Sequence, residues 1–118
     1  MRIKRTFAAV FGAALLLAGQ AFAHHSGAQF DREKTKTTEA IVTRFDFKNP
    51  HAYIYVKPTN AKAVEWEFEM MDVANLFRGG WRKNSLVPGD KIKVTYYPFR
   101  KEGSGGGLLI SVTDPKGK

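Results

Sequence analysis

Hydrophobic and polar residues alternate along much of the chain after position 36. The clearest case is the segment 64–70, VEWEFEM, in which four apolar residues alternate with three glutamates. Successive side chains of a strand point to opposite faces, so this pattern predicts a strand with one buried face. Other segments rich in β-branched and aromatic residues predict four further strands, at 37–47, 52–57, 91–97 and 108–112.

One short helix is expected between the third and fourth strands. Asp72 can cap a helix over 73–78, and Gly79 can end it. Turns are expected at Asn49-Pro50, 58–62 and 86–90, and the glycine-rich segment 101–107 is expected to be a flexible loop.

The predicted element order is therefore β-β-β-α-β-β, which is the order of a five-stranded OB-like barrel. We expect an all-β domain over 37–113, preceded by a polar arm at 24–36 and followed by a polar tail at 114–118. Closing the sheet would hide its edges. A split barrel or an open sheet with one helix is the alternative.

The first 23 residues have the pattern of a secretory signal peptide. Three basic residues are followed by an apolar run at 7–19 and by Ala21-Phe22-Ala23, which fits the A-x-A cleavage rule. We therefore expect cleavage after Ala23, a periplasmic or secreted protein, and no integral membrane span once the signal is removed. An uncleaved anchor is the alternative.

Composition narrows the chemistry further. The chain has 118 residues and no cysteine, which excludes disulfides, a lipid-modified amino terminus and thiolate metal sites. Its formal charge is +8, but the basic residues are scattered and part of the excess lies in the predicted signal. We interpret the charge as a solvated surface and expect no nucleic acid partner.

Few residues suggest catalysis. The serines lack a nucleophile-elbow motif, and the glycine-rich segment leads into a strand, whereas a phosphate-binding loop leads into a helix. Glu65, Glu67 and Glu69 lie on one predicted strand face, where cross-strand pairing with Arg44, Lys57, Lys91 or Lys93 would explain them. We assign no catalytic residue, and an enzyme is the less favoured class.

The histidines are the candidate metal ligands. His24 and His25 would stand at the new amino terminus, and His51 follows Asn49-Pro50. A first-position histidine offers both its amine and its ring nitrogen, and a second imidazole would complete a site suited to tetragonal Cu(II). Copper is thus the expected cofactor. Alternatively, His24 and His25 belong to an unstructured chain end and His51 forms a hydrogen bond within its turn.

The aromatic residues suggest a second class of function. Trp66 and Phe68 are expected in the core, whereas a ligand or partner face is assigned to Tyr53, Tyr55, Trp81 and Tyr97. In this reading the protein is an interaction module, and its aromatic and basic surface holds a partner protein, a glycan or a lipid head group. The histidines would then be incidental.

Several short motifs together resemble a family of small exported bacterial proteins of unknown function. They are His24-His25-Ser26, Phe30-Asp31, the segment 45–54 (FDFKNPHAYI), Gly80-Trp81, the segment 86–90 (LVPGD) and Gly106-Gly107. The family typically has a larger apolar residue where this chain has Gly27, and often a tryptophan where this chain has Phe47. The resemblance implies an exported, single small β domain in which the HHS and NPH motifs belong to one pattern, and it implies no particular activity.

Overall fold

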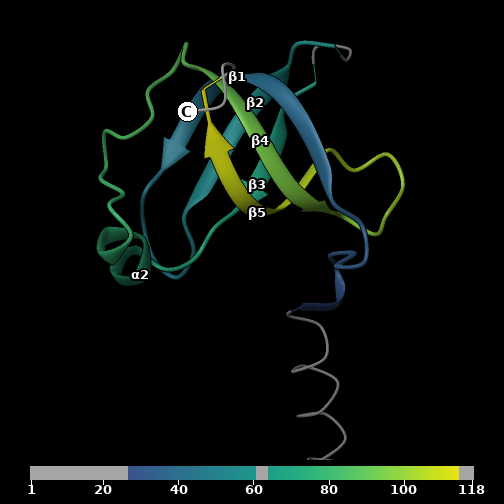
Figure 1. The fold of residues 1–118 in the computed structure, drawn as a ribbon, viewed down its shortest axis with the longest axis horizontal. Helices are drawn as coiled ribbons and strands as arrows, with labels where there is room; N and C mark the ends of the chain where they lie inside the picture. The colour runs from purple at the N-terminus through teal and green to yellow at the C-terminus, as the bar shows by residue number, and fades with distance from the viewer. Residues whose placement is uncertain (1–26, 61–63, 115–118) are drawn as a thin grey trace, which may run out of the picture.

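The computed structural model describes residues 27–60 and 64–114 (Figure 1). Five strands and one short helix follow one another in the predicted order. Their bounds are β1 Lys36–Asp46, β2 Tyr53–Pro58, β3 Trp66–Glu69, α2 Val73–Arg78, β4 Lys91–Pro98 and β5 Gly106–Thr113.

The strands form a closed barrel in the order β1-β2-β3-β5-β4, with β4 pairing back to β1. All neighbouring strands are antiparallel except β3 and β5, which are parallel. The sequence prediction of a five-stranded barrel with one short helix is confirmed. Because the sheet closes on itself, each strand has a partner on both sides.

Alternate residues of the strands fill the barrel. Val42, Ile54, Val56 and Val94 are fully buried, and the ring of Phe68 packs 4.8 Å, centroid to centroid, from that of Tyr96. Burial of an aliphatic or aromatic side chain of this size contributes about 1.5–3 kcal/mol. A core of such residues stabilises the domain without disulfides.

A bulge in β1 is held by the turn at 86–90. The pairing of β1 with β2 shifts register between Val42 and Arg44. The Val42 N–H donates to the carbonyl oxygen of Asp90 (2.9 Å), and the Gly89 N–H donates to that of Val42 (2.8 Å). The Asp90 carboxylate in turn accepts from the Val87 N–H. A bulge bends a strand, so this turn helps to set the curvature of the barrel.

The end of the amino-terminal arm packs onto the barrel. Phe30 is only 2% exposed, and its ring stacks on Phe99 with centroids 5.3 Å apart. The Asp31 N–H donates to the carbonyl of Pro98, and the Arg100 N–H donates to that of Gln29, each at 2.8 Å. The arm and the loop 99–105 therefore lie side by side (Figure 1).

The glycine-rich segment is more tightly packed than the sequence suggests. β5 begins at Gly106, two residues before its expected start. A Cβ at Gly105 would overlap the Trp66 ring, and one at Gly106, where φ is +109°, would overlap the Glu67 carbonyl. These two glycines therefore allow the chain to approach β3 closely, and only the preceding residues form an open loop.

Candidate functional site

The loop between β1 and β2 is tied to the corner between β3 and α2. The side-chain oxygen of Asn49 accepts a hydrogen bond (3.0 Å) from the Val73 N–H, the first of α2. The His51 ring bonds through Nδ1 to the carbonyl oxygen of Met70 at 3.1 Å. The Met70 N–H also donates to the carbonyl of Ala52. The Asn-Pro-His segment is thus held at both of its polar side chains.

These contacts change the expected capping of α2. Asp72 is at the N-cap position, but its side chain makes no capping hydrogen bond to the backbone. Its carboxylate accepts from the side chain of Asn75 instead, and Asn49 from the distant loop satisfies the Val73 N–H. The predicted helix bounds are confirmed, whereas the predicted capping by Asp72 is wrong because a tertiary contact supplies the acceptor.

The hydrogen bond of His51 determines which ring nitrogen keeps a free lone pair. A carbonyl oxygen can only accept, so Nδ1 carries the hydrogen. In the neutral ring Nε2 then keeps its lone pair, and it makes no hydrogen bond to the described residues. His51 is exposed. Metal-binding histidines commonly use one nitrogen for the metal and the other for such a backbone contact.

The other two predicted ligands, His24 and His25, lie outside the described residues. Within residues 27–60 and 64–114, no group of three or more His, Cys, Asp or Glu side chains is arranged to hold a metal ion. The structure therefore places one of the three predicted ligands, His51.

The predicted aromatic face is only partly assembled. Tyr53 and Tyr55 are neighbours on the outer face of β2, with ring centroids 6.2 Å apart, and the Arg44 guanidinium lies 4.0 Å from the centroid of Tyr55. Trp81 packs instead on Phe45 at 5.8 Å, next to the core. Tyr97 belongs to β4, which does not neighbour β2.

Tyr53 is held in its protonated form. Its hydroxyl donates to a carboxylate oxygen of Glu69 at 2.9 Å. Partial burial is the main reason why the pKa of Tyr53 is raised to about 12, and the Glu69 hydrogen bond adds to it. Tyr53 therefore remains a hydrogen-bond donor at any pH near neutrality.

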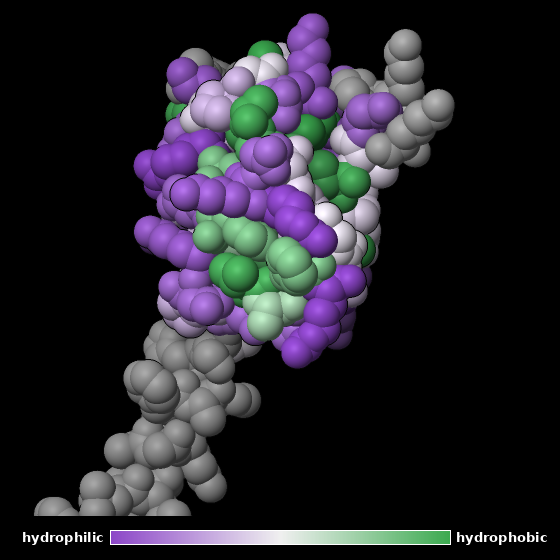
Figure 2. All heavy atoms as spheres, turned by 90° about the vertical axis from the view of Figure 1, so that its left-hand side faces the viewer, coloured by the Kyte–Doolittle hydropathy of each residue, from purple (hydrophilic) through white to green (hydrophobic). Residues whose placement is uncertain are grey.

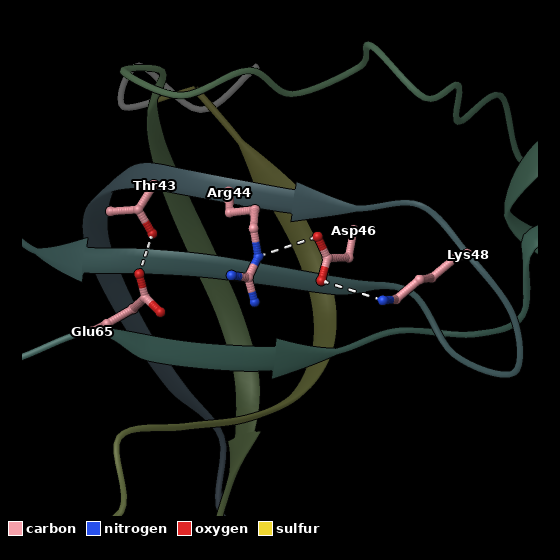
Figure 3. A network of polar contacts seen from close by, with 5 residues as sticks. All are labelled: Thr43, Arg44, Asp46, Lys48 and Glu65. Atoms are coloured by element: carbon pink, nitrogen blue, oxygen red, sulfur yellow. Dashed lines mark hydrogen bonds and ion pairs between the residues drawn. The ribbon is translucent and has the colours of Figure 1, made fainter.

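A polar network crosses the outer face of β1, β2 and β3 (Figure 3). Asp46 pairs with Arg44 at 3.2 Å and with Lys48 at 3.9 Å, while the Thr43 hydroxyl donates to Glu65 at 2.7 Å. Exposed ion pairs contribute only about 0–1 kcal/mol each. The network therefore orients side chains more than it stabilises the fold.

Glu65, which precedes β3, and Glu67 and Glu69 within β3 have different environments. Thr43 donates to Glu65 and Tyr53 donates to Glu69, whereas the carboxylate of Glu67 has no hydrogen bond or ion pair with the described residues. The expected partners Lys91 and Lys93 belong to β4, which pairs with β1 and β5 and not with β3. Hydroxyl groups from β1 and β2 take their place.

A cleft of about 570 Å³ opens beside Glu67. The outer face of β2 and β3 forms one wall, and the loop 99–105 forms the other. Its lining includes Tyr55, Trp66, Glu67, Phe99, Arg100 and Ser104. Of these, only Tyr55 is among the residues that the sequence pattern predicts for a ligand face. The general signal for the others is the OB-type element order, because such barrels bind ligands between strands 2–3 and the flanking loops.

A separate apolar patch lies on the side of the barrel that carries α2. Figure 2 looks at this side and shows hydrophobic side chains gathered within a border of hydrophilic ones. Met71 and Phe77 are 57% and 53% exposed, and the Arg82 guanidinium covers the Phe77 ring at 3.7 Å. This patch adjoins the corner that holds His51.

Comparison with known proteins gives one match. The model of a family described as a family of unknown function (DUF6152) matches residues 13–109, which include the arm, the first four strands and the first half of β5. The chain belongs to this family. No curated protein and no solved structure matches. Membership in DUF6152 carries no activity with it.

None of the helices within residues 27–60 and 64–114 has both the length and the apolar character needed to cross a membrane.

Proposed function

We propose that this protein is an exported, non-enzymatic binding or accessory protein that holds copper at its mature amino terminus. The ligands are the amine and ring of His24, the ring of His25 and Nε2 of His51. The observation that carries the proposal is the state of His51, an exposed residue whose Nδ1 is hydrogen-bonded to the Met70 carbonyl while Nε2 has no hydrogen bond to the described residues.

The orientation of His51 supports a ligand role in energetic terms. A free histidine side chain loses rotamer freedom when it binds a metal, whereas a ring that is already hydrogen-bonded has lost part of that freedom on folding. The same hydrogen bond selects the tautomer in which Nε2 is the ligand atom. Asn49 ties the same loop to α2, because its side-chain oxygen accepts the hydrogen bond from the Val73 N–H.

The chemistry of the donors favours copper. An α-amine has a pKa near 7.7–8 and can therefore be deprotonated by a metal at neutral pH. Cu(II) binds amine and imidazole nitrogens in tetragonal geometry and is the strongest binder in the divalent series. The absence of cysteine removes the soft ligands that favour zinc in structural sites.

The test is a competition titration of Cu(II) against a chromogenic chelator. Protein that begins at His24 is compared with protein that carries one extra amino-terminal glycine. We expect at least a hundredfold weaker binding for the extended form, because its His24 amine is an amide. Equal affinities would contradict the amino-terminal site.

His51 is tested with two substitutions. His51→Ala removes both ring nitrogens, whereas His51→Asn keeps an N–H donor for the Met70 carbonyl and removes only Nε2. We expect both variants to bind Cu(II) at least tenfold more weakly than the parent. Normal affinity in His51→Asn would show that the ring has a structural role only. Lys57→Ala, an exposed change at the other end of β2, is the matched control.

A further inference from the structure

We infer that the cleft between the β2–β3 face and the loop 99–105 binds a neutral oligosaccharide. This site is separate from the proposed copper site and requires no metal. Its lining comes from three separate parts of the chain: the arm at Gln29, the strands at Tyr55 and Glu67, and the loop at Arg100 and Ser104. Each part is fixed by contacts already described.

The apolar part of the cleft consists of aromatic rings that are held in place. Phe99 stacks on the buried Phe30 at 5.3 Å. Trp66 packs against the core and lies close to Gly105. The Tyr55 ring is held by the Arg44 guanidinium, 4.0 Å from its centroid, and by the neighbouring Tyr53 ring. Rings that are already fixed lose little entropy on binding, and they suit the C–H faces of sugar rings.

The polar part offers both acceptors and donors. Glu67 has a carboxylate with no partner among the described residues, and Glu65 beside it is oriented by the Thr43 hydroxyl. The opposite wall supplies the hydroxyl of Ser104 and the amide of Gln29. Sugar hydroxyls donate and accept at adjacent carbons, so a lining with both kinds of group matches them.

The charges of the cleft favour a neutral ligand. Glu65, just before β3, and Glu67 on β3 line the cleft together with Arg100 and Lys101 of the loop. Within the described residues no ion pair joins the two walls. The charges balance, so a ligand of either sign meets repulsion from one wall. A neutral molecule can form charge-assisted hydrogen bonds with both walls, which are stronger than neutral ones.

The size of the cleft agrees with this class of ligand. A volume of about 570 Å³ lies within the roughly 300–1,000 Å³ of small-molecule sites. The cleft is open to solvent, so we expect weak affinity, with dissociation constants in the millimolar range or somewhat below.

The experiment is an NMR titration of metal-free protein that begins at His24, in buffer with EDTA. The probes are maltotriose, cellotriose and chitotriose, followed through the backbone amides. We expect at least one of the three to give saturable shifts centred on Tyr55, Glu67 and Ser104. No saturable shift with any of the three would overturn the inference.

Two variants locate the site. Glu67→Ala removes an exposed carboxylate without a described partner, so the fold should survive, and affinity should fall at least tenfold. Glu39→Ala changes an exposed glutamate of β1 that lies opposite Lys93 in the strand register and does not line the cleft, and this variant should bind like the parent. Unchanged binding in Glu67→Ala would contradict the assignment of the cleft.

Two further measurements distinguish this inference from the copper proposal and from an anion site in the same cleft. His51→Asn should bind the sugar normally, so failure of the copper proposal leaves this one intact. Sulfated trisaccharide is the charged probe. If it alone shifts the cleft amides and loses its effect in 0.5 M NaCl, the cleft is an anion site on Arg100 and Lys101, and the inference is wrong.

Discussion

The arm at residues 29–31 should contribute a large share of the stability of the domain. Phe30 is 2% exposed and stacks on Phe99, while backbone hydrogen bonds at Gln29 and Asp31 fasten the chain on either side of it. Phe30→Ala removes the ring and leaves the backbone unchanged. It therefore tests whether the arm is part of the folded unit.

The loss of unfolding free energy in Phe30→Ala depends on whether the arm stays on the barrel or detaches from it. If the arm stays in place and a cavity remains, a Phe→Ala change costs about 3–5 kcal/mol. If the arm detaches, the loss approaches the burial energy of the ring, about 1.5–3 kcal/mol. We expect a loss of about 3 kcal/mol, a large part of the 5–15 kcal/mol that is typical of a domain.

The assay is equilibrium urea unfolding of protein that begins at His24, followed by tryptophan fluorescence. For a urea m-value of about 1–3 kcal/mol per M, a loss of about 3 kcal/mol should lower the midpoint by about 1–3 M. Hydrogen exchange then separates the two responses, because detachment would expose the amides of Asp31 and Arg100, whose acceptors lie across the contact. A retained cavity would leave them protected.

The control is Val64→Ala, at a side chain that is 63% exposed. It should change the free energy of unfolding by less than about 0.5 kcal/mol. A change as small as this in Phe30→Ala would refute the reasoning, because it would show that the arm does not add to the stability of the barrel.

Two other changes test the strand contacts. Gly106→Ala should destabilise the domain by about 2 kcal/mol or more, because φ is +109° at this position and a Cβ would overlap the Glu67 carbonyl. Thermal unfolding measures the loss, and an unchanged stability would contradict the close approach of β5 to β3. Tyr53→Phe should cost about 1 kcal/mol, since it removes one hydrogen bond to the half-exposed Glu69 carboxylate. In a Glu69→Ala background, which has no side-chain acceptor at this position, the same substitution should cost close to nothing.

Much of the fold could be predicted from the sequence because the strands are strongly patterned. Alternation at 64–70 gives the buried face of β3, and Asn49-Pro50 and Pro88-Gly89 mark the chain breaks. The bounds of α2 agree with the prediction. These features depend on neighbours along the chain, which a sequence displays directly.

The missed features depend on residues that are distant in sequence. Phe30 is a single apolar residue in a polar segment, and only its pairing with Phe99 reveals its burial. Asn49 caps a helix 24 positions away. The glycines of β5 were expected to be flexible because composition cannot show that Trp66 and Glu67 press against them.

In the candidate site, too, the sequence indicates the residue types but not the contacts between distant residues. Sequence reasoning can name His51 and Tyr55 by residue type, but it cannot show that the Met70 carbonyl fixes the ring of His51. Nor can it find the cleft, which is formed where the arm, two strands and the loop 99–105 meet.

The most direct test of the copper proposal is native mass spectrometry of the protein purified from the exporting host. The account predicts a chain that begins at His24 and carries one copper ion, with the copper lost in the variant that has an extra amino-terminal residue. A mature chain that begins elsewhere, or one that begins at His24 and holds no copper after loading with Cu(II), would contradict it.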